Sequence, residues 1–427
     1  MNRTHFTLDQ WLGWMEKSHP VAIDLGLDRV NQVYLRLNLD FSAIHVVTVA
    51  GTNGKGSTVC MLESIYRHAG YTTASYTSPH LQVYNERVRI DGELSTDEQL
   101  VEAFCAVDAA RESISLSYFE MGTLAALWLI EKQKPDVAIL EVGLGGRLDA
   151  VNVLDPDVAV VTTIDIDHVD WLGDNREKIG WEKAGIFRSG KPAACGELNP
   201  PESIKNYAQQ LKTPLWQLNQ QFHYQISDGV WNWQGQDSQG NPLTISALPI
   251  PKLPLQNAAT AVQAIQLGPL QCSVSNIASG LSEARVAGRM DRTVFASCQT
   301  ILDVAHNPQS ARYLAEQIKL LELSSVQLVI GMLADKDCAS VVEALKDVVT
   351  HWHLVSLNVP RGQSSAQLSR TLNQQGVPNE SISCYGSVTD ALTLLKMSVQ
   401  PSSDTIVIAG SFYTVGDAYS YLTQGVN

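Results

Sequence analysis

Residues 45–58 read His-Val-Val-Thr-Val-Ala-Gly-Thr-Asn-Gly-Lys-Gly-Ser-Thr and carry the strongest structural signal in the chain. A run of β-favouring residues leads into a turn with three glycines and one lysine. A helical pattern follows, with apolar or small residues three or four positions apart at Val59, Leu62, Ile65 and Ala69, and Gly70 is a typical helix stop. The stretch therefore predicts a strand, a glycine loop and a helix.

This arrangement is typical of phosphate-binding loops, because glycine lets backbone N–H groups approach oxygen atoms and the helix N-terminus adds partial positive charge. The match to the general P-loop pattern is imperfect. The first glycine of the pattern would fall on Val49 but stands at position 51, and the hydroxyl residue is Ser57. An ordinary glycine turn between a core strand and a helix is the alternative. Lys55 argues against that alternative, since a mere turn needs no cation.

The composition is that of a globular protein with two domains, since 427 residues contain 44% hydrophobic and 17% charged residues. No apolar run approaches the roughly 20 residues of a membrane helix, and the N-terminus lacks the apolar core of a signal peptide. Seven scattered cysteines without a C-x-x-C pair fit reduced thiols. The net charge of −14 argues against a nucleic-acid surface. We therefore expect a cytoplasmic monomer that acts on small molecules, with no nucleic-acid and no membrane partner.

Polar residues follow several predicted strands, at the sheet edge where open α/β sheets bind ligands. Residues 71–76 predict a strand that ends in Thr-Ser-Pro-His, with Ser78 and His80. The strand over 136–141 ends in Glu141, and such an acid commonly holds magnesium opposite a phosphate loop. Residues 83–90 predict an extended segment with two arginines, Arg87 and Arg89, on one face. A solvated sheet edge is the alternative for this segment.

Three more stretches carry candidate site residues. Residues 165–173 follow an apolar strand and read Asp-Ile-Asp-His-Val-Asp-Trp-Leu-Gly. Three carboxylates and a histidine are too many for a packed turn, so they predict a metal or phosphate site. A helix over 175–187 then carries Lys183. Before the apolar helix that reaches residue 130 stand Tyr118, Phe119 and Glu120, whose aromatic rings could equally belong to the core.

The organisation of the chain is α/β throughout. Residues 215–240 predict a small β excursion, and Asn257 opens an alanine-rich helix. Further strands, each followed by a helix, predict a parallel sheet covered on both faces; they lie near 300–304, 326–332, 352–357, 381–385 and 405–410. We expect a P-loop nucleotide-binding parallel-sheet domain over 1–287 and a smaller Rossmann-like α/β domain over 288–427.

A phosphate loop, an acid-ended strand and an Asp/His cluster predict a site for ATP and magnesium. Residues 170–173 fit the D-x-x-G element of GTP-driven switches, but the chain has no Asn-Lys-x-Asp sequence to read guanine. A kinase would need a base beside a hydroxyl acceptor, and no kinase-specific set is present. A ligase that activates a carboxylate with ATP suits the second domain, which could deliver an amine and exclude water. The spacing of these residues alone does not decide between a kinase and a ligase.

Five segments in register closely resemble the folylpolyglutamate synthase family, relatives of the muramyl peptide ligases, and they are residues 51–57, 77–81, 141–150, 182–186 and 303–308. The resemblance spans nearly the whole chain. Residues 116–120 resemble the dihydropteroate-binding segment of the family's bifunctional bacterial members. The resemblance implies a two-step amide ligation. The γ-phosphate of ATP passes to a carboxylate of dihydropteroate or of a reduced folate, and the amine of L-glutamate then displaces phosphate from the acyl phosphate.

The resemblance also implies the roles of individual residues. ATP is held by Thr52, Asn53, Gly54, Lys55, Asn257, Arg289 and Asp303. Two Mg²⁺ ions are bound by Ser78, Glu141 and His168, although histidine is an unusual ligand for so hard a cation. The pteroate site is formed by Ser117, Tyr118, Phe119, Glu120, Leu148, Asp149 and Ala150. Lys183 matches a lysine that is carboxylated to a carbamate, and His306 is expected near the glutamate or the transferring phosphate. The catalytic candidates are therefore Lys55, Lys183 and His306.

Overall fold

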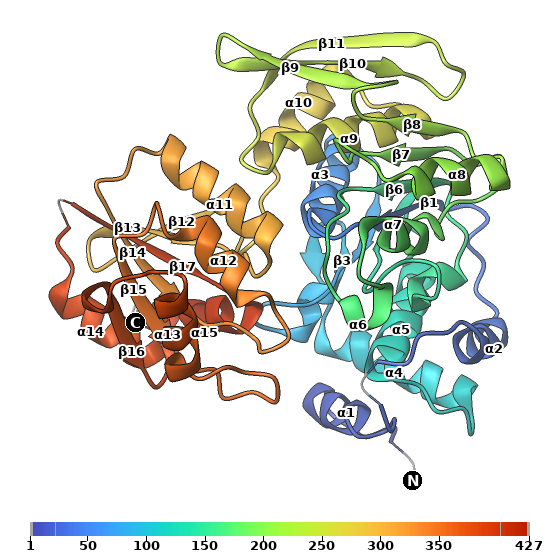
Figure 1. Ribbon diagram of the computed structural model, residues 1–427. Coiled ribbons are helices and arrows are strands. Elements are labelled where there is room, and N and C mark those ends of the chain that lie inside the picture. Colours follow the sequence, from blue (N-terminus) through green and yellow to red (C-terminus); the bar gives the residue numbers. More distant parts are fainter. Residues whose placement is uncertain (1–2, 22, 402, 425–427) are drawn as a thin grey trace. The chain divides into compact units, whose positions relative to one another are not determined.

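The computed structural model describes residues 3–21, 23–401 and 403–424, and the chain divides into two compact units (Figure 1). The first unit contains the chain up to His80 and Tyr84–Ala284. The second contains Arg285 onward together with Leu81–Val83. The division falls just before the domain boundary that the sequence predicts between 287 and 288. Within the described ranges, the helices are too short or too polar to cross a lipid bilayer.

The first unit is built on an eight-stranded sheet in the order β4-β3-β2-β5-β1-β6-β7-β8. Its strands are β1 (His45–Ala50), β2 (Thr73–Tyr76), β3 (Val88–Ile90), β4 (Glu93–Leu94), β5 (Val137–Glu141), β6 (Val158–Val161), β7 (Ala193–Cys195) and β8 (Leu215–Gln217). All neighbours pair in parallel except β3 and β4, which add an antiparallel edge. Every residue of β1 is buried, because it lies centrally in a sheet covered on both faces.

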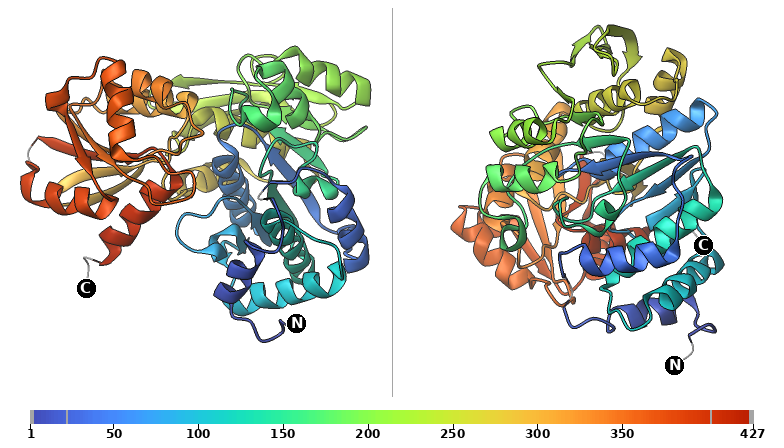
Figure 2. Two further views of the ribbon diagram at one scale, coloured as in Figure 1. Left: turned by 60° about the horizontal axis from the view of Figure 1, so that its bottom comes forward. Right: turned by 90° about the vertical axis from the view of Figure 1, so that its right-hand side faces the viewer.

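Helices pack against both faces of this sheet (Figure 2). One face is covered by α1 (Leu8–Met15), α2 (Asp28–Leu37), α4 (Asp97–Arg111), α5 (Tyr118–Gln133), α7 (Arg176–Ala184) and α8 (Glu202–Leu211). The other face is covered by α3 (Lys55–His68) and α9 (Leu255–Leu267), and α10 (Val274–Glu283) packs on α3. The predicted strand, glycine loop and helix are thus confirmed as β1, the loop over 51–54 and α3.

The polar stretch near residue 230 forms a separate three-stranded antiparallel sheet. Its strands are β9 (His223–Ser227), β10 (Val230–Gln236) and β11 (Pro242–Pro249). The predicted β excursion is confirmed, although β8 at its start belongs to the main sheet. Trp231 and Trp233 of β10 are fully buried, and the indole of Trp233 donates to the backbone oxygen of Ala259 in α9 at 3.2 Å. The excursion is therefore anchored to the first unit.

The second unit is a six-stranded sheet in the order β12-β13-β17-β14-β15-β16. The strands are β12 (Asp291–Phe295), β13 (Cys298–Leu302), β14 (Ser325–Ile330), β15 (His351–Val355), β16 (Ile382–Tyr385) and β17 (Asp404–Ala409). One face is covered by α11 (Pro308–Leu320), α12 (Cys338–Leu345) and α13 (Ser365–Gln374), and the other by α14 (Val388–Ser398) and α15 (Phe412–Gln424). The predicted parallel α/β domain is confirmed.

Three predictions are wrong in detail. The apolar spacing over residues 7–38 predicts helix, and the structure instead has two separate helices there, α1 and α2. Tyr84–Arg87 forms a short 3₁₀ helix where an extended segment is predicted. The antiparallel strand β12 was not expected, because its exposed residues Arg292, Thr293 and Val294 lack an alternating apolar pattern.

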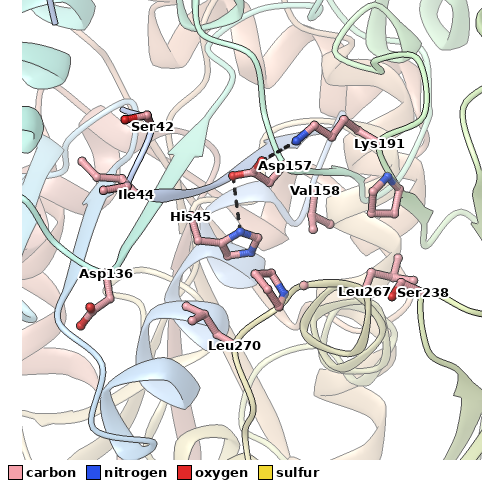
Figure 3. Close-up of a pocket in the computed structure, with 14 residues that line it drawn as sticks. Ser42, Ile44, His45, Asp136, Asp157, Val158, Lys191, Ser238, Leu267 and Leu270 are labelled. Atoms are coloured by element: carbon pink, nitrogen blue, oxygen red, sulfur yellow. Dashed lines mark hydrogen bonds and ion pairs between the residues drawn. The ribbon is translucent and has the colours of Figure 1, made fainter. Parts of the chain in front are cut away.

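A cavity of about 560 Å³ lies at the amino ends of the strands of the first sheet (Figure 3). Figure 3 shows Asp157 joined to His45 and to Lys191, at 3.5 Å and 2.8 Å. These bonds, with a 3.0 Å bond from the Val46 N–H, hold the pKa of Asp157 far below its usual range. The glycine loop is at the carboxyl end of β1, so this cavity is not part of the site described below.

Acid should weaken the second unit through His353. Its imidazole is buried in β15, where Nε2 contacts the amide oxygen of Gln327 at 3.0 Å and Nδ1 contacts the hydroxyl of Tyr385 at 3.1 Å. Burial, and second the neighbouring His351, lower the pKa of His353 to about 4. The unfolded chain therefore binds one more proton between about pH 6.5 and 4, and stability falls by about 1.4 kcal/mol per pH unit there. Urea unfolding at pH 7.5 and 5.5 should show a smaller loss for His353→Gln than for wild type. An equal loss in both proteins would refute this assignment.

Candidate active site

Four loops gather at the carboxyl edge of the first sheet, because they follow neighbouring parallel strands. Val49 of β1 pairs with Glu141 of β5, Ala50 pairs with Val161 of β6, and Tyr76 of β2 pairs with Leu140. The connections after β1 and β5 lead to opposite sides of the sheet, which is where open α/β sheets form ligand crevices. The predicted site residues of the first unit largely belong to these loops.

The glycine loop has the geometry of an anion site. Gly54 precedes α3 with φ +85°, and a Cβ there would lie 2.6 Å from the side-chain amide nitrogen of Asn257. Gly54 is therefore required both for its backbone conformation and for the close approach of Asn257. The ammonium of Lys55 donates to the backbone oxygens of Gly51 and Thr52 at 3.0 Å and 3.3 Å. Gly54, Lys55, Thr52 and Asn257, predicted to hold ATP, thus lie together.

Residues after β6 brace the loop, and of these only Asp165 belongs to a stretch that the sequence predicts as a site. The hydroxyl of Thr52 donates to the backbone oxygen of Asp165 at 3.1 Å. The N–H of Asn53 donates to the hydroxyl of Thr163 at 3.0 Å, and the hydroxyl of Thr162 donates to the backbone oxygen of Asn53 at 2.6 Å. Consecutive threonines at a strand end are the only sequence signal for this brace. The polar residues that follow β6 therefore fix the loop backbone.

A carboxylate and a hydroxyl residue meet beside the loop. The N–H of Ser78 donates to Oε2 of Glu141 at 3.1 Å, and a Cβ on Gly56, in the first turn of α3, would lie 3.6 Å from the same oxygen. Glu141 is buried. A buried carboxylate next to a hydroxyl side chain is the hard oxygen donor set that Mg²⁺ prefers, so the residues fit that cation.

His168 lies in the loop that follows β6. It precedes the short helix α6 (Val169–Leu172) with φ +53°, and its Nε2 lies 4.0 Å from a carboxylate oxygen of Asp167. Among the described residues, no group of three or more His, Cys, Asp or Glu side chains is arranged to hold a metal ion. The structure thus brings Ser78 and Glu141 together, and His168 belongs to a separate strand-end loop.

Two buried groups of opposite charge, Lys183 and Asp149, interact electrostatically with the partly buried Lys55 at the same edge. Lys183 of α7 is only 2% exposed. Burial, and second the ammonium of Lys55, lower the pKa of Lys183 to about 7, against the fields of Asp167 and Asp149. Burial raises the pKa of Asp149 to about 6, although the backbone N–H groups of Leu144 and Val151 donate to its carboxylate at 2.8 Å and 3.0 Å. A neutral amine is therefore accessible to Lys183 near neutral pH.

The predicted pteroate residues lie on two neighbouring segments. Ser117 caps α5 in a capping box with Glu120, and Arg29 of α2 binds Glu120 at 2.8 Å. The Phe119 ring packs so closely on Gly143 that a Cβ there would lie 2.4 Å from the ring. The loop over 142–149 carries half-buried Leu148, and Asp149 caps the turn that begins at Ala150. The two predicted segments, 117–120 and 148–150, are thus linked through the loop that follows β5.

An arginine and a histidine lie next to the rings of Tyr84 and Tyr118, which together with the ring of Phe119 are called the aromatic wall below. Nε of Arg87 donates to Nδ1 of His80 at 2.9 Å, and its guanidinium lies 5.2 Å and 5.7 Å from the ring centres of Tyr84 and Tyr118. Burial, and second the guanidinium of Arg87, lower the pKa of His80 to about 4. Arg87 is buried, so the alternative of a solvated edge is wrong for this residue.

The second unit contributes a cluster of its own. Asp303 is buried and accepts from the N–H groups of Met290 and Ala305 at 2.8 Å and 2.9 Å. Burial raises its pKa, against the field of Arg289. Nδ1 of His306 contacts the backbone oxygen of Val304 at 2.8 Å, which assigns the hydrogen to Nδ1. Both Arg289 and His306 pack on the ring of Phe412, at 5.4 Å and 6.2 Å. The three predicted residues Arg289, Asp303 and His306 therefore lie together.

This fold and these loops define a nucleotide-dependent ligase of the Mur ligase type. Residues 49–241 match the Mur ligase middle domain, and residues 288–412 match the Mur ligase glutamate ligase domain. The chain is 44% identical to a dihydrofolate synthase/folylpolyglutamate synthase of Escherichia coli, over 96% of this chain and 94% of that protein. It is 39% identical to the protein of that name from Haemophilus influenzae, over 97% of each chain. The chain belongs to the dihydrofolate synthase/folylpolyglutamate synthase family.

Solved structures agree with this assignment over the full length. A structure described as E. coli FolC in complex with DHPP and ADP is 42% identical, covers 100% of both chains and has a TM-score of 0.94. A bifunctional folylpolyglutamate synthase/dihydrofolate synthase from Yersinia pestis, complexed with AMPPNP and a Mn ion, is 41% identical. It covers 99% of this chain and 100% of its own, with a TM-score of 0.92. The predicted P-loop and Rossmann-like α/β organisation is thus confirmed.

Proposed function

We propose that this chain is an ATP-dependent acid–amino-acid ligase that joins L-glutamate to 7,8-dihydropteroate, giving dihydrofolate, and to the glutamate tail of reduced folates. The observation that carries the proposal is full-length similarity to relatives of this activity, with the glycine loop, Glu141 and the pteroate segments at one sheet edge. The acceptor carboxylate takes the γ-phosphate of ATP, and the amine of L-glutamate displaces phosphate from the resulting acyl phosphate.

Each residue group has one task in this reaction. The loop over 51–55 and Asn257 bind the ATP phosphates, because backbone N–H groups, the start of α3 and the Lys55 ammonium all favour anions. Ser78, Glu141 and His168 would hold Mg²⁺, which would neutralise phosphate charge. Asp303 and Arg289 of the second unit contact ATP, and His306 serves the glutamate or the transferring phosphate.

The acceptor binds along residues 117–120 and 148–150. Tyr118 and Phe119 offer flat apolar surfaces on which a pterin ring can stack as aromatic pairs do. The buried Asp149 presents a carboxyl group whose pKa of about 6 leaves it mostly ionised at neutral pH. Such a carboxylate suits the amino and N–H groups of a pterin edge.

We also place the protein in the cytosol as a monomer. Its seven cysteines form no disulfide, which suits a reducing compartment. Dihydropteroate, reduced folates, L-glutamate and ATP are its partners, and the net charge of −14 disfavours nucleic acid. Sedimentation of the purified protein near the monomer mass of 46.7 kDa would support this part of the proposal, and a stable dimer would refute it.

The aromatic wall can be tested by changes on both of its sides. Phe119→Ala removes the stacking surface, and Gly143→Ala forces the Phe119 ring to move, because the added Cβ would lie 2.4 Å from the ring. Both variants should raise KM for dihydropteroate about tenfold, since an aromatic contact is worth about 0.5–1.5 kcal/mol beyond its buried area. KM for ATP should change less than twofold. Equal changes in both constants would show that Phe119 is only a core residue.

A further inference from the structure

The buried guanidinium of Arg87 is unusual in this molecule. Arg87 is 8% exposed, yet within the described residues no ion pair joins it to a carboxylate. Its partners are neutral groups, namely the imidazole of His80, the hydroxyl of Tyr76 and the rings of Tyr84 and Tyr118. Other arginines of the first unit pair with acids: Arg29 with Glu120, Arg147 with Glu182, and Arg176 with Glu197. Glu86, the preceding residue, contributes a weaker field at His80 than Arg87 does. A buried charge without a counter-ion is costly, and it indicates that an anion arrives with a ligand.

The contact between Arg87 and His80 determines which nitrogen of the imidazole ring carries the hydrogen. Nδ1 of His80 accepts from Nε of Arg87 at 2.9 Å, so in the neutral ring the hydrogen is on Nε2. The ring is partly exposed and packs on Tyr84, with ring centres 5.7 Å apart. His80 therefore presents one N–H donor, backed by a positive charge that is shielded from water.

The position of this pair identifies the anion. His80 belongs to the loop after β2, two residues beyond Ser78, whose N–H binds Glu141 beside the glycine loop. Arg87 lies against Tyr118, next to Phe119 in the wall proposed for the pteroate group. Under the proposed function, the acceptor is held on the Tyr118 side of this pair and phosphate is transferred on the Ser78 side. The acceptor's own reacting group, a carboxylate, is the anion that this arrangement would bring to the pair.

We propose that His80 is a substrate-binding residue whose Nε2–H holds the acceptor carboxylate, and that Arg87 is the positioning residue behind it. The proposal rests on the proposed ligase function. Arg87 keeps the His80 ring in one tautomer and orientation, and its charge makes the Nε2–H a stronger donor toward an anion. Discrimination between a carboxylate and a neutral group of the same shape therefore depends on this pair.

The test compares two acceptor-site ligands, dihydropteroate and its carboxamide, in variants of the pair. Wild-type protein is first shown to ligate glutamate to dihydropteroate, so that failure of the function is separated from failure of this inference. Dissociation constants for both ligands are then measured by calorimetry with ADP present. Wild type should bind the carboxylate at least tenfold more tightly than the carboxamide. In His80→Phe and in Arg87→Met this preference should fall below threefold, because the first change removes the donor and the second removes the group that orients it.

Three controls separate recognition from loss of fold. Arg89→Lys, in the strand β3 that directly follows Arg87, keeps the charge that pairs with Glu63 at 3.6 Å and should retain the wild-type preference. His80→Gln keeps a hydrogen-bond donor and should retain part of the preference for the carboxylate. The double variant His80→Phe/Arg87→Met should lose no more preference than either single variant, since the two residues act as a unit. A preference for the carboxylate that persists at tenfold in folded His80→Phe and Arg87→Met would overturn the proposal.

Discussion

Lys55→Ala is expected to lower kcat for dihydrofolate synthesis by about 10²–10³, the effect of losing an oriented charge worth about 3–4 kcal/mol in the transition state. Lys55 begins α3 at the end of the glycine loop, and its ammonium donates to the backbone oxygens of Gly51 and Thr52. Charged phosphate oxygens bind an ammonium more strongly than neutral backbone oxygens do.

The loss should appear in turnover and not in the fold. Thermal unfolding of Lys55→Ala should match wild type within a few degrees, because Lys55 is only partly buried and its hydrogen bonds to Gly51 and Thr52 are local. Lys178→Ala is a suitable control, since Lys178 is a lysine of α7 that is exposed and pairs with Asp174 at 3.0 Å. Near-native turnover of Lys55→Ala at saturating ATP would show that the loop is only a structural turn.

Lys183→Ala is expected to abolish ligation, and formate or acetate should restore part of it. Lys183 is buried, and burial together with Lys55 lowers its pKa to about 7, so about half of the amine is neutral at pH 7. We propose that the neutral nitrogen attacks carbon dioxide, so that a N–C bond forms and one proton leaves to solvent. The product is a carbamate anion, which balances the nearby Lys55 and offers hard oxygen donors.

The carbamate can be tested without relying on the substitution alone. Wild-type protein depleted of bicarbonate should lose activity and regain it when bicarbonate is added, more readily above pH 7 than below it, since the neutral amine is then more abundant. A high-resolution density map should show three extra atoms on Nζ of Lys183. A bare ammonium in the map, together with activity indifferent to bicarbonate, would contradict the assignment.

The strands and loops of the candidate site could be predicted where a local sequence pattern and the topology of a parallel sheet both indicate the same structure. Residues 45–70 combine a strand run, glycines and a helical period, so β1, the loop and α3 follow from sequence. Glu141 and Ser78 were placed at one edge because carboxyl ends of parallel strands always meet there. Their direct contact at 3.1 Å agrees with that argument.

Other features depend on contacts between distant parts of the chain. Phe119 packs on Gly143, and Thr163 accepts a hydrogen bond from the N–H of Asn53. In each pair the two residues are far apart in the sequence, so no local periodicity predicts the contact. The burial of Arg87 was ambiguous, since a polar residue near a sheet edge is usually solvated, and here a 3₁₀ turn directs it toward Tyr118. The strand β12 was not predicted, because most of its residues are exposed and its composition is therefore similar to that of a loop.

The most direct test of the proposed function is release of phosphate by the purified protein in the presence of ATP, Mg²⁺, L-glutamate and dihydropteroate. One phosphate and one ADP should be formed for each dihydrofolate, and omission of either L-glutamate or dihydropteroate should stop steady turnover. Replacement of dihydropteroate by a reduced folate should give a product one glutamate longer. Hydrolysis of ATP that is indifferent to both acceptor and glutamate, with no new amide, would contradict the account.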